Sequence, residues 1–191
     1  MVVVVLLLLL LLLLLLLLLL LLLLLLLLLL LLTLLLLTLL LLLLLQAGAN
    51  GNVQHWHMTS RKCLHTVEEE ENQVFTLEYN AAGTKFATAG KDYVVRIYDE
   101  ATKSELQALS RGIGKTTPGH SNRVFSLKFS PQDENLLVSA GWDNTVQIWD
   151  ARTNSSVRSI FGPHICGDAM DLQGNQILTG SWRPDEQCQV T

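Results

Sequence analysis

The chain has 191 residues, and valine or leucine fills nearly all of positions 2–45, with Thr33 and Thr38 the exceptions. All 13 basic and 17 acidic residues lie beyond that tract, at a density ordinary for a soluble domain. The net charge of -4 and the lack of a Lys/Arg cluster argue against a dedicated nucleic-acid surface, and three cysteines without CxxC spacing suggest neither a disulfide framework nor a zinc site.

The leucine-rich tract, residues 1–45, is longer than the roughly 18 apolar residues that suggest a membrane span. As a helix it would be about 66 Å long, some twice the thickness of the hydrocarbon core. No basic residue precedes the apolar run, and its length exceeds that of a signal-peptide core several-fold. We interpret the tract as a helix-prone low-complexity segment produced by expansion or a mis-joined reading frame, with a membrane span as the alternative.

Short apolar runs separated by Gly, Pro, Asp and Asn clusters follow the tract, and they predict antiparallel strands. The first group, residues 46–71, supplies the strands VQHWH and CLHTV. We expect that it lacks two earlier strands and that Glu68–Glu71 forms an exposed link.

The next two groups each supply four strands. Residues 72–112 contain VFTLEY, KFATA, VVRIY and SELQAL, and residues 119–162 contain VFSLKF, LLVSA, TVQIWD and SVRSIF. Residues 163–191 begin another group with CGDAMDL, a QGN turn, QILTG and the start of a third strand. The expected class is all-β, with two full four-stranded units and two partial ones.

Gly119-His120 and Trp149-Asp150 resemble the GH and WD signature of a WD40 β-propeller blade, with Trp56-His57 and Tyr98-Asp99 as degenerate pairs. The resemblance implies an incomplete WD40 propeller over residues 46–191, a fragment with about three blades' worth of sequence. Propellers close with roughly four to eight blades.

The resemblance also implies a buried hydrogen-bond relay in the third group, formed by His120, Ser139, Asp143 and Trp149. Because the repeat accounts for all four, a structural role is favoured over a Ser-His-Asp catalytic one. In the second group the matching residues are Glu70, Thr88, Asp92 and Tyr98. The histidine is absent there, so that relay is expected to be incomplete.

Other patterns that could carry chemistry are weak. Gly112–Thr116 ends like a phosphate loop, but Leu109 stands where the motif needs glycine. His55, His57, Cys63 and His65 match no zinc spacing, and Asn154-Ser155-Ser156 is a glycosylation sequon that matters only in a secreted chain. We expect no catalytic, cofactor-binding or metal-binding residue.

Function should then reside on loops at one face of the propeller. The resemblance places the link before each blade beside the turn between its second and third strands. The residues flanking those positions, and hence the candidate partner contacts, are Glu71, Gln73, Lys91, Ser121, Arg123 and Trp142. Trp142 is the preferred contact because Trp and Arg are enriched among interface hot spots, with a tryptophan folded over its own turn as the alternative.

The expected function is a non-enzymatic WD-repeat scaffold that binds other proteins, in a reducing, cytoplasmic compartment. Residues 137–152 also resemble the box ending in W-D-x-R of WD-repeat substrate receptors of cullin-type ubiquitin ligases. Arg152 is the residue that adds information to that second hypothesis. A third hypothesis is a membrane-tethered propeller, if the leucine tract is genuine.

Overall fold

The computed structural model describes residues 2–40, 43–111, 119–153, 155–182 and 189–190. The chain divides into two units, one made of residues 1–44 with 57–62 and the other of residues 45–56 with 63–191. The first contains helix α1 (Val2–Leu40), 39 residues long, as the helix propensity of leucine predicts.

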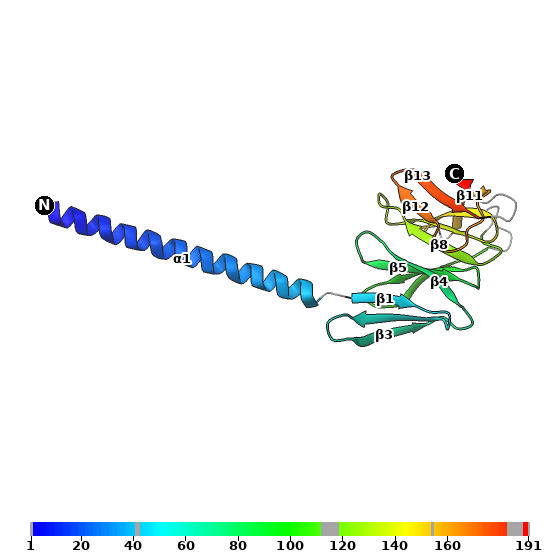
Figure 1. Ribbon diagram of the computed structural model, residues 1–191, viewed down its shortest axis with the longest axis horizontal. Coiled ribbons are helices and arrows are strands. Elements are labelled where there is room, and N and C mark those ends of the chain that lie inside the picture. Colours follow the sequence, from blue (N-terminus) through cyan, green and yellow to red (C-terminus); the bar gives the residue numbers. More distant parts are fainter. Residues whose placement is uncertain (1, 41–42, 112–118, 154, 183–188, 191) are drawn as a thin grey trace. The chain divides into compact units, whose positions relative to one another are not determined.

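The strands of the second unit form four sheets (Figure 1). Sheet 1 contains β1 (Leu43–Ala47), β2 (Asn52–His57) and β3 (Lys62–Glu68). Sheet 2 contains β4 (Val74–Tyr79), β5 (Lys85–Gly90), β6 (Val95–Asp99) and β7 (Glu105–Leu109). Sheet 3 contains β8 (Val124–Phe129), β9 (Leu136–Gly141), β10 (Thr145–Asp150) and β11 (Ser155–Phe161). Sheet 4 contains β12 (Met170–Gln173), β13 (Gln176–Ser181) and β14 (Gln189–Val190).

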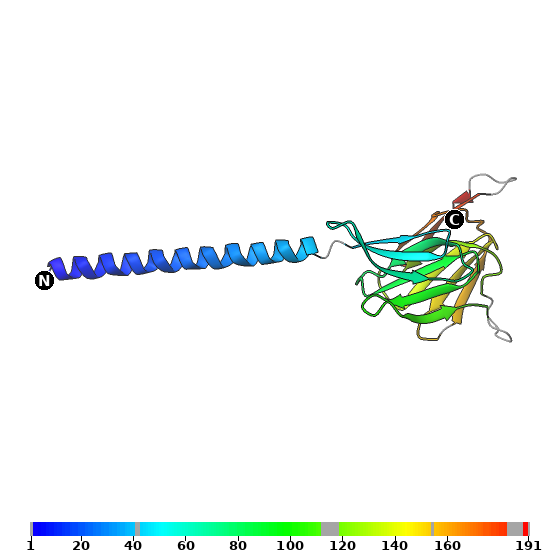
Figure 2. The same cartoon turned by 90° about the horizontal axis from the view of Figure 1, so that it is seen from below.

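Each strand pairs with the next one along the chain, and the pairing in sheets 2–4 is antiparallel. Strands β4, β8 and β12, the first of their sheets, lie beside one another (Figures 1 and 2). The predicted strands therefore occur in the predicted order, with bounds that agree to within one or two residues, except that β12 starts four residues later than expected.

Sheet 1 differs from the prediction. The end of the leucine tract supplies β1, which is hydrogen-bonded to β2, so this sheet has three strands and lacks one earlier strand rather than two. Leu45 and Ala47 pack against a cluster that contains Val53 and Val74. Strand β1 crosses the boundary predicted at residue 46, because pairing along β2 overrides the helical preference of leucine.

The apolar core lies between successive sheets. Phe86 and Tyr98 of sheet 2 pack with Val53 of sheet 1. A second cluster, which contains Leu109 and Trp149, joins sheets 2 and 3, and a third lies between sheets 3 and 4. Each sheet therefore depends on its neighbour for burial of its apolar face, as in a propeller.

Candidate partner-binding surface

Sheet 3 contains a continuous chain of buried hydrogen bonds. Trp149 Nε1 donates to Ser139 Oγ at 2.7 Å, and Ser139 Oγ lies 2.6 Å from His120 Nε2. His120 Nδ1 lies 2.7 Å from Asp143 Oδ2, which also accepts the backbone N–H of Ser121 at 3.0 Å. A His120 tautomer protonated at Nδ1 satisfies every group in this chain.

The carboxylate of Asp143 is held in its charged form. Burial alone would raise its pKa, but hydrogen bonds from His120, the Ser121 backbone and Thr145 outweigh burial and hold the pKa below its ordinary value. Ser139 Oγ is fully occupied by His120 and Trp149 inside the sheet. The arrangement joins the link before β8 to the β9–β10 turn, and it gives no exposed nucleophile.

Sheet 2 carries a related set of buried hydrogen bonds in which Glu69 takes the place of His120. Glu69, only 5% exposed, accepts hydrogen bonds from Thr88 Oγ1 and from Tyr98 OH at 3.1 Å through Oε1. Burial beside this carboxylate raises the pKa of Tyr98, which keeps the phenol protonated. Glu70 is exposed. The assignment of Glu70 to the relay was therefore wrong by one residue. The relay differs from that of sheet 3, because Thr88 and Tyr98 both donate to Glu69.

Two side chains connect Glu69 to the turn aspartate of sheet 2. Asn72 Nδ2 donates to Glu69 Oε2 at 2.6 Å, and Asn72 Oδ1 accepts the Asp92 backbone N–H at 3.2 Å. Arg96 lies 3.3 Å from Glu69 Oε2 and 2.6 Å from Asp92 Oδ2. The predicted exposed acidic link is thus exposed at Glu68, Glu70 and Glu71 but buried at Glu69.

The link and the turn lie side by side in both sheets. Lys91 N donates to Gln73 O at 3.0 Å in sheet 2, and Trp142 N donates to Arg123 O at 2.9 Å in sheet 3. A Cβ on Gly90 or Gly141, the residues before Lys91 and Trp142, would collide with those same carbonyl oxygens. Glycine is required at each position because the two backbones approach so closely.

Trp142 is half-buried at this junction. Its ring centroid lies 4.9 Å from that of Phe125 and 6.4 Å from that of His164, nearly parallel to the latter. Its Nε1 donates to Cys166 Sγ at 3.1 Å, and the Arg123 guanidinium carbon lies 5.2 Å from its ring centroid. Trp142 therefore packs on the link to sheet 4, rather than standing fully exposed or lying over its own turn alone.

Two phenylalanines extend this group into sheet 2, and sequence reasoning missed them. Phe75 and Phe125 occupy bulges at the start of β4 and β8, and their rings stack at 4.8 Å and 8°. Their equivalence in VFTLEY and VFSLKF was a usable sequence signal. We define the aromatic–cation surface as these half-buried rings and the nearby cations: Phe75, Lys91, Arg123, Phe125, Trp142 and His164.

Within the described residues, neither Lys91 nor Arg123 forms an ion pair with a carboxylate. Lys91 is exposed and Arg123 is half-buried. Glu71 and Ser121 are exposed on the two links, and Glu71 has a positive φ of 62°. The predicted contacts therefore lie on the two junctions, and the guanidinium of Arg123 lies beside the Trp142 ring.

Arg152 lies elsewhere, in the turn after β10. Its Nε donates to Asp150 Oδ1 at 3.0 Å, and its NH2 group donates to Asp133 Oδ2 at 3.0 Å. The side chain is still 59% exposed. Two carboxylates therefore fix the direction of an accessible guanidinium.

The sequence contains three other patterns that could carry chemistry. His55 is buried and lies 3.3 Å from Glu100, and no group of three or more His, Cys, Asp or Glu suited to a metal occurs among the described residues. Gly112–Thr116 and Asn154 fall outside the described residues, and Leu109 is buried at the end of β7.

The family model for the WD domain, G-beta repeat, matches residues 61–99 and 113–150. The chain contains WD40 repeats. The two matched WD40 repeats include most of sheets 2 and 3, with the relay partners Thr88, Tyr98, Ser139 and Trp149.

The chain is similar to curated proteins that carry different names. Nuclear distribution protein PAC1 from Candida tropicalis is 28% identical over 141 residues, which cover 68% of this chain and 26% of that protein. Target of rapamycin complex subunit LST8 from Saccharomyces cerevisiae is 30% identical over 113 residues, 59% of this chain and 35% of that protein. The chain thus spans between about a quarter and about a third of these two relatives.

Solved structures agree on the fold. The structure of U3-55K and the crystal structure of RRP9 WD40 repeats each match with a TM-score of 0.63 at 20% identity. Each match covers 78% of this chain and 47% of the other. The four sheets therefore have the fold of WD40 β-propeller blades, and in the described residues two of them have four strands and two have three.

Proposed function

We propose that the propeller blades act as a non-enzymatic scaffold that binds other proteins through the aromatic–cation surface. The observation that carries this proposal is the contrast between two sets of polar groups. The relay groups in sheets 2 and 3 are satisfied by one another, whereas Lys91 and Arg123 have no carboxylate partner among the described residues. Half-buried aromatic rings beside such cations are typical of interface hot spots.

A protein partner is favoured over a nucleic acid. Arg123 and Lys91 are two cations in a chain of net charge -4, and two cations do not form the basic stripe that binding of a nucleic-acid backbone requires. The family to which the repeats belong consists generally of interaction scaffolds, and the relay offers no free nucleophile or base. We also propose a cytoplasmic setting for the propeller, because Cys63 and Cys166 are exposed free thiols.

The test is quantitative affinity capture with the full chain. Proteins retained by the wild-type chain are compared with those retained by Arg123→Ala and Lys91→Ala. Arg158→Ala is the matched control, since Arg158 is an exposed arginine on β11 away from this surface. We expect the affinity for specific partners to fall by about 30-fold in each surface variant, which corresponds to one hot spot of about 2 kcal/mol. Equal losses for Arg158→Ala, or none for either surface variant, would place binding elsewhere.

A second candidate function is that of substrate receptor for a cullin-type ubiquitin ligase. It is favoured by the exposed Arg152 guanidinium, whose direction is fixed by Asp133 and Asp150. Recovery of the ligase adaptor should fall in Arg152→Ala and persist in Arg158→Ala. Unchanged recovery of the adaptor with Arg152→Ala would reject this function.

A further inference from the structure

Helix α1 presents an apolar surface on all its sides. Every leucine from Leu9 to Leu34 is 56–68% exposed. None of this 26-residue window is buried, and it contains no charged residue. A surface of this kind in water would be strongly unfavourable, so it requires an occupant.

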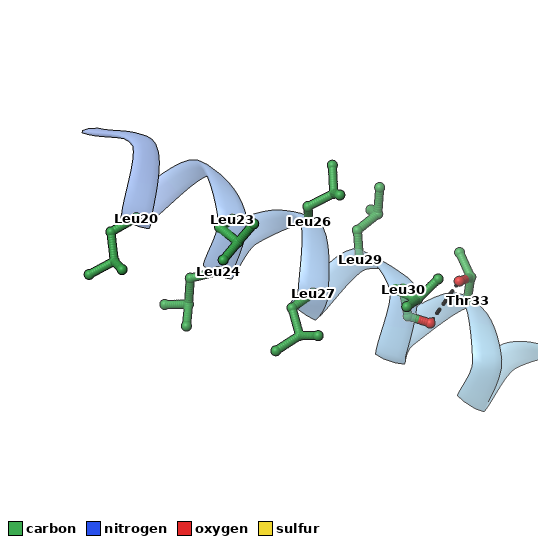
Figure 3. A pocket seen from close by; sticks show the side chains of 8 residues that line it. All are labelled: Leu20, Leu23, Leu24, Leu26, Leu27, Leu29, Leu30 and Thr33. Atoms are coloured by element: carbon green, nitrogen blue, oxygen red, sulfur yellow. Dashed lines mark hydrogen bonds between the residues drawn. The ribbon is translucent and has the colours of Figure 1, made fainter. Parts of the chain in front are cut away.

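The distribution of the leucines narrows the choice of occupant. Figure 3 shows side chains between Leu20 and Thr33 projecting from several sides of the helix, and the hollow among them is lined by this one helix. An amphipathic helix has one apolar stripe for one protein partner, whereas a helix that is apolar all round is buried on every side. The tract also lacks the Gly, Ala and Ser positions that let membrane helices pack closely together. Lipid chains surround such a helix without needing a complementary shape.

The length and polarity of the helix fit the same occupant. The Leu9–Leu34 window is about 39 Å long and belongs to a 39-residue helix of about 58 Å. The helix is therefore longer than a hydrocarbon core of roughly 30 Å, and tilting or local thickening of the bilayer accommodates such an excess. The helix satisfies its own backbone hydrogen bonds, and the Thr33 hydroxyl donates to the Leu30 carbonyl at 2.8 Å. No described polar side chain in the window therefore enters the bilayer without a partner.

We propose that α1 spans a lipid bilayer and thereby tethers the propeller blades to a membrane. This inference is independent of which protein the aromatic–cation surface binds. It takes up the membrane-span alternative of the sequence analysis, because a bilayer covers an apolar surface on every side of a helix.

The first experiment measures insertion. The full chain is synthesised in a cell-free system with sealed phosphatidylcholine vesicles, which are floated in a density gradient and washed with alkaline carbonate. We expect most of the chain to float and to resist the wash. The triple variant Leu18→Arg, Leu22→Arg, Leu26→Arg should reduce the carbonate-resistant fraction by about tenfold or more, because central arginines oppose insertion. The control variant replaces the same three leucines with isoleucine and should insert like the wild type.

The second experiment distinguishes spanning from lying on the surface. Two chains, each with one cysteine, are labelled in sealed vesicles with a maleimide that does not cross membranes. One retains exposed Cys63, and the other carries Val2→Cys, with the remaining cysteines replaced by serine. Spanning predicts that only one of the two chains reacts before detergent is added and that both react afterwards. Reaction of both chains before detergent, or a chain that aggregates without floating, would overturn the proposal.

Discussion

At the scale of single residues, the hydroxyl of Ser139 links two buried side chains by hydrogen bonds. Its hydroxyl contacts Trp149 Nε1 and His120 Nε2, and all three side chains are fully buried or nearly so. Removing the hydroxyl leaves both neighbours unsatisfied, while the backbone and the apolar core remain unchanged. The relay therefore stabilises the blade chiefly through the penalty that its loss would impose.

Ser139→Ala should accordingly lower the free energy of unfolding by about 2–4 kcal/mol, one penalty for each orphaned group. The measurement is urea unfolding of the full chain in mild detergent, with tryptophan fluorescence as the signal. Ser121→Ala is the control, because only the backbone N–H of the exposed Ser121 takes part in the relay. A loss that is the same for both variants would show that the hydroxyl of Ser139 has no special role.

Glu69 shows that a relay can be rebuilt around a carboxylate if a cation accompanies it. Arg96 contacts both Glu69 and Asp92, and its side chain is 18% exposed. Arg96→Met would leave Glu69 buried with neutral donors only. We expect a loss of about 3 kcal/mol in the free energy of unfolding.

A double-mutant cycle tests this prediction by comparing Arg96→Met, Glu69→Gln and the variant that carries both substitutions. The neutral amide that Glu69→Gln introduces retains an acceptor oxygen for Thr88 and Tyr98, so Arg96→Met should be less harmful when Glu69→Gln is already present. Additive losses in the cycle would mean that Arg96 does not compensate the Glu69 charge.

At the scale of elements, the turn residues and the period-two patterns predicted almost every strand of sheets 2–4. Strand β1 could not be predicted, because a run of leucine carries no strand signal and only the edge of β2 selects its conformation. The relay of sheet 2 was recoverable. Glu69 precedes Thr88 by 19 residues, as His120 precedes Ser139. The stacking of Trp142 on His164 could not be predicted from the sequence, because it depends on how the link to sheet 4 folds back.

The junction between sheets 1 and 2 contains a histidine that should make stability depend on pH. His55 on β2 is 1% exposed and packs edge-on against Phe86 of β5. Burial, together with the positive charge of Lys103 and the proximity of His65, lowers its pKa below 6.5, although Glu100 opposes this effect. Glu100 in turn accepts a hydrogen bond from Tyr79 and forms an ion pair with Lys103.

Because the pKa of His55 is lower in the folded chain, the unfolded chain binds more protons below about pH 6.5. The free energy of unfolding should therefore fall as the pH drops through 6.5 towards the folded pKa. Asp143 adds a separate loss of stability at more acidic pH, below about 3.8, because folding lowers its pKa.

Chemical unfolding between pH 7.5 and pH 5 measures the His55 contribution, with roughly 0.5-unit steps adequate for the slope. His55→Gln should remove that slope and His57→Gln should retain it; a slope that survives in His55→Gln would refute the assignment.

At the scale of the whole molecule, each of the three described apolar clusters joins two successive blades. The three apolar clusters lie between sheets 1 and 2, sheets 2 and 3, and sheets 3 and 4. In such an array, stability is approximately a sum of contributions from each unit and each interface. Damage to one interface should therefore remain local.

Ile165 provides the test of that locality. It is fully buried between sheets 3 and 4, and its backbone N–H donates to Gly141 O at 3.2 Å. Ile165→Ala removes buried methyl groups and should destabilise this interface by about 2–4 kcal/mol. In native-state hydrogen exchange, amides of β12 and β13 should lose roughly 30-fold or more of their protection, whereas amides of β2 and β3 should retain theirs. Leu178→Ala, on the exposed side of β13, serves as the control and should leave both sets unchanged. A uniform loss of protection across all four sheets would instead show that the blades unfold as one cooperative unit.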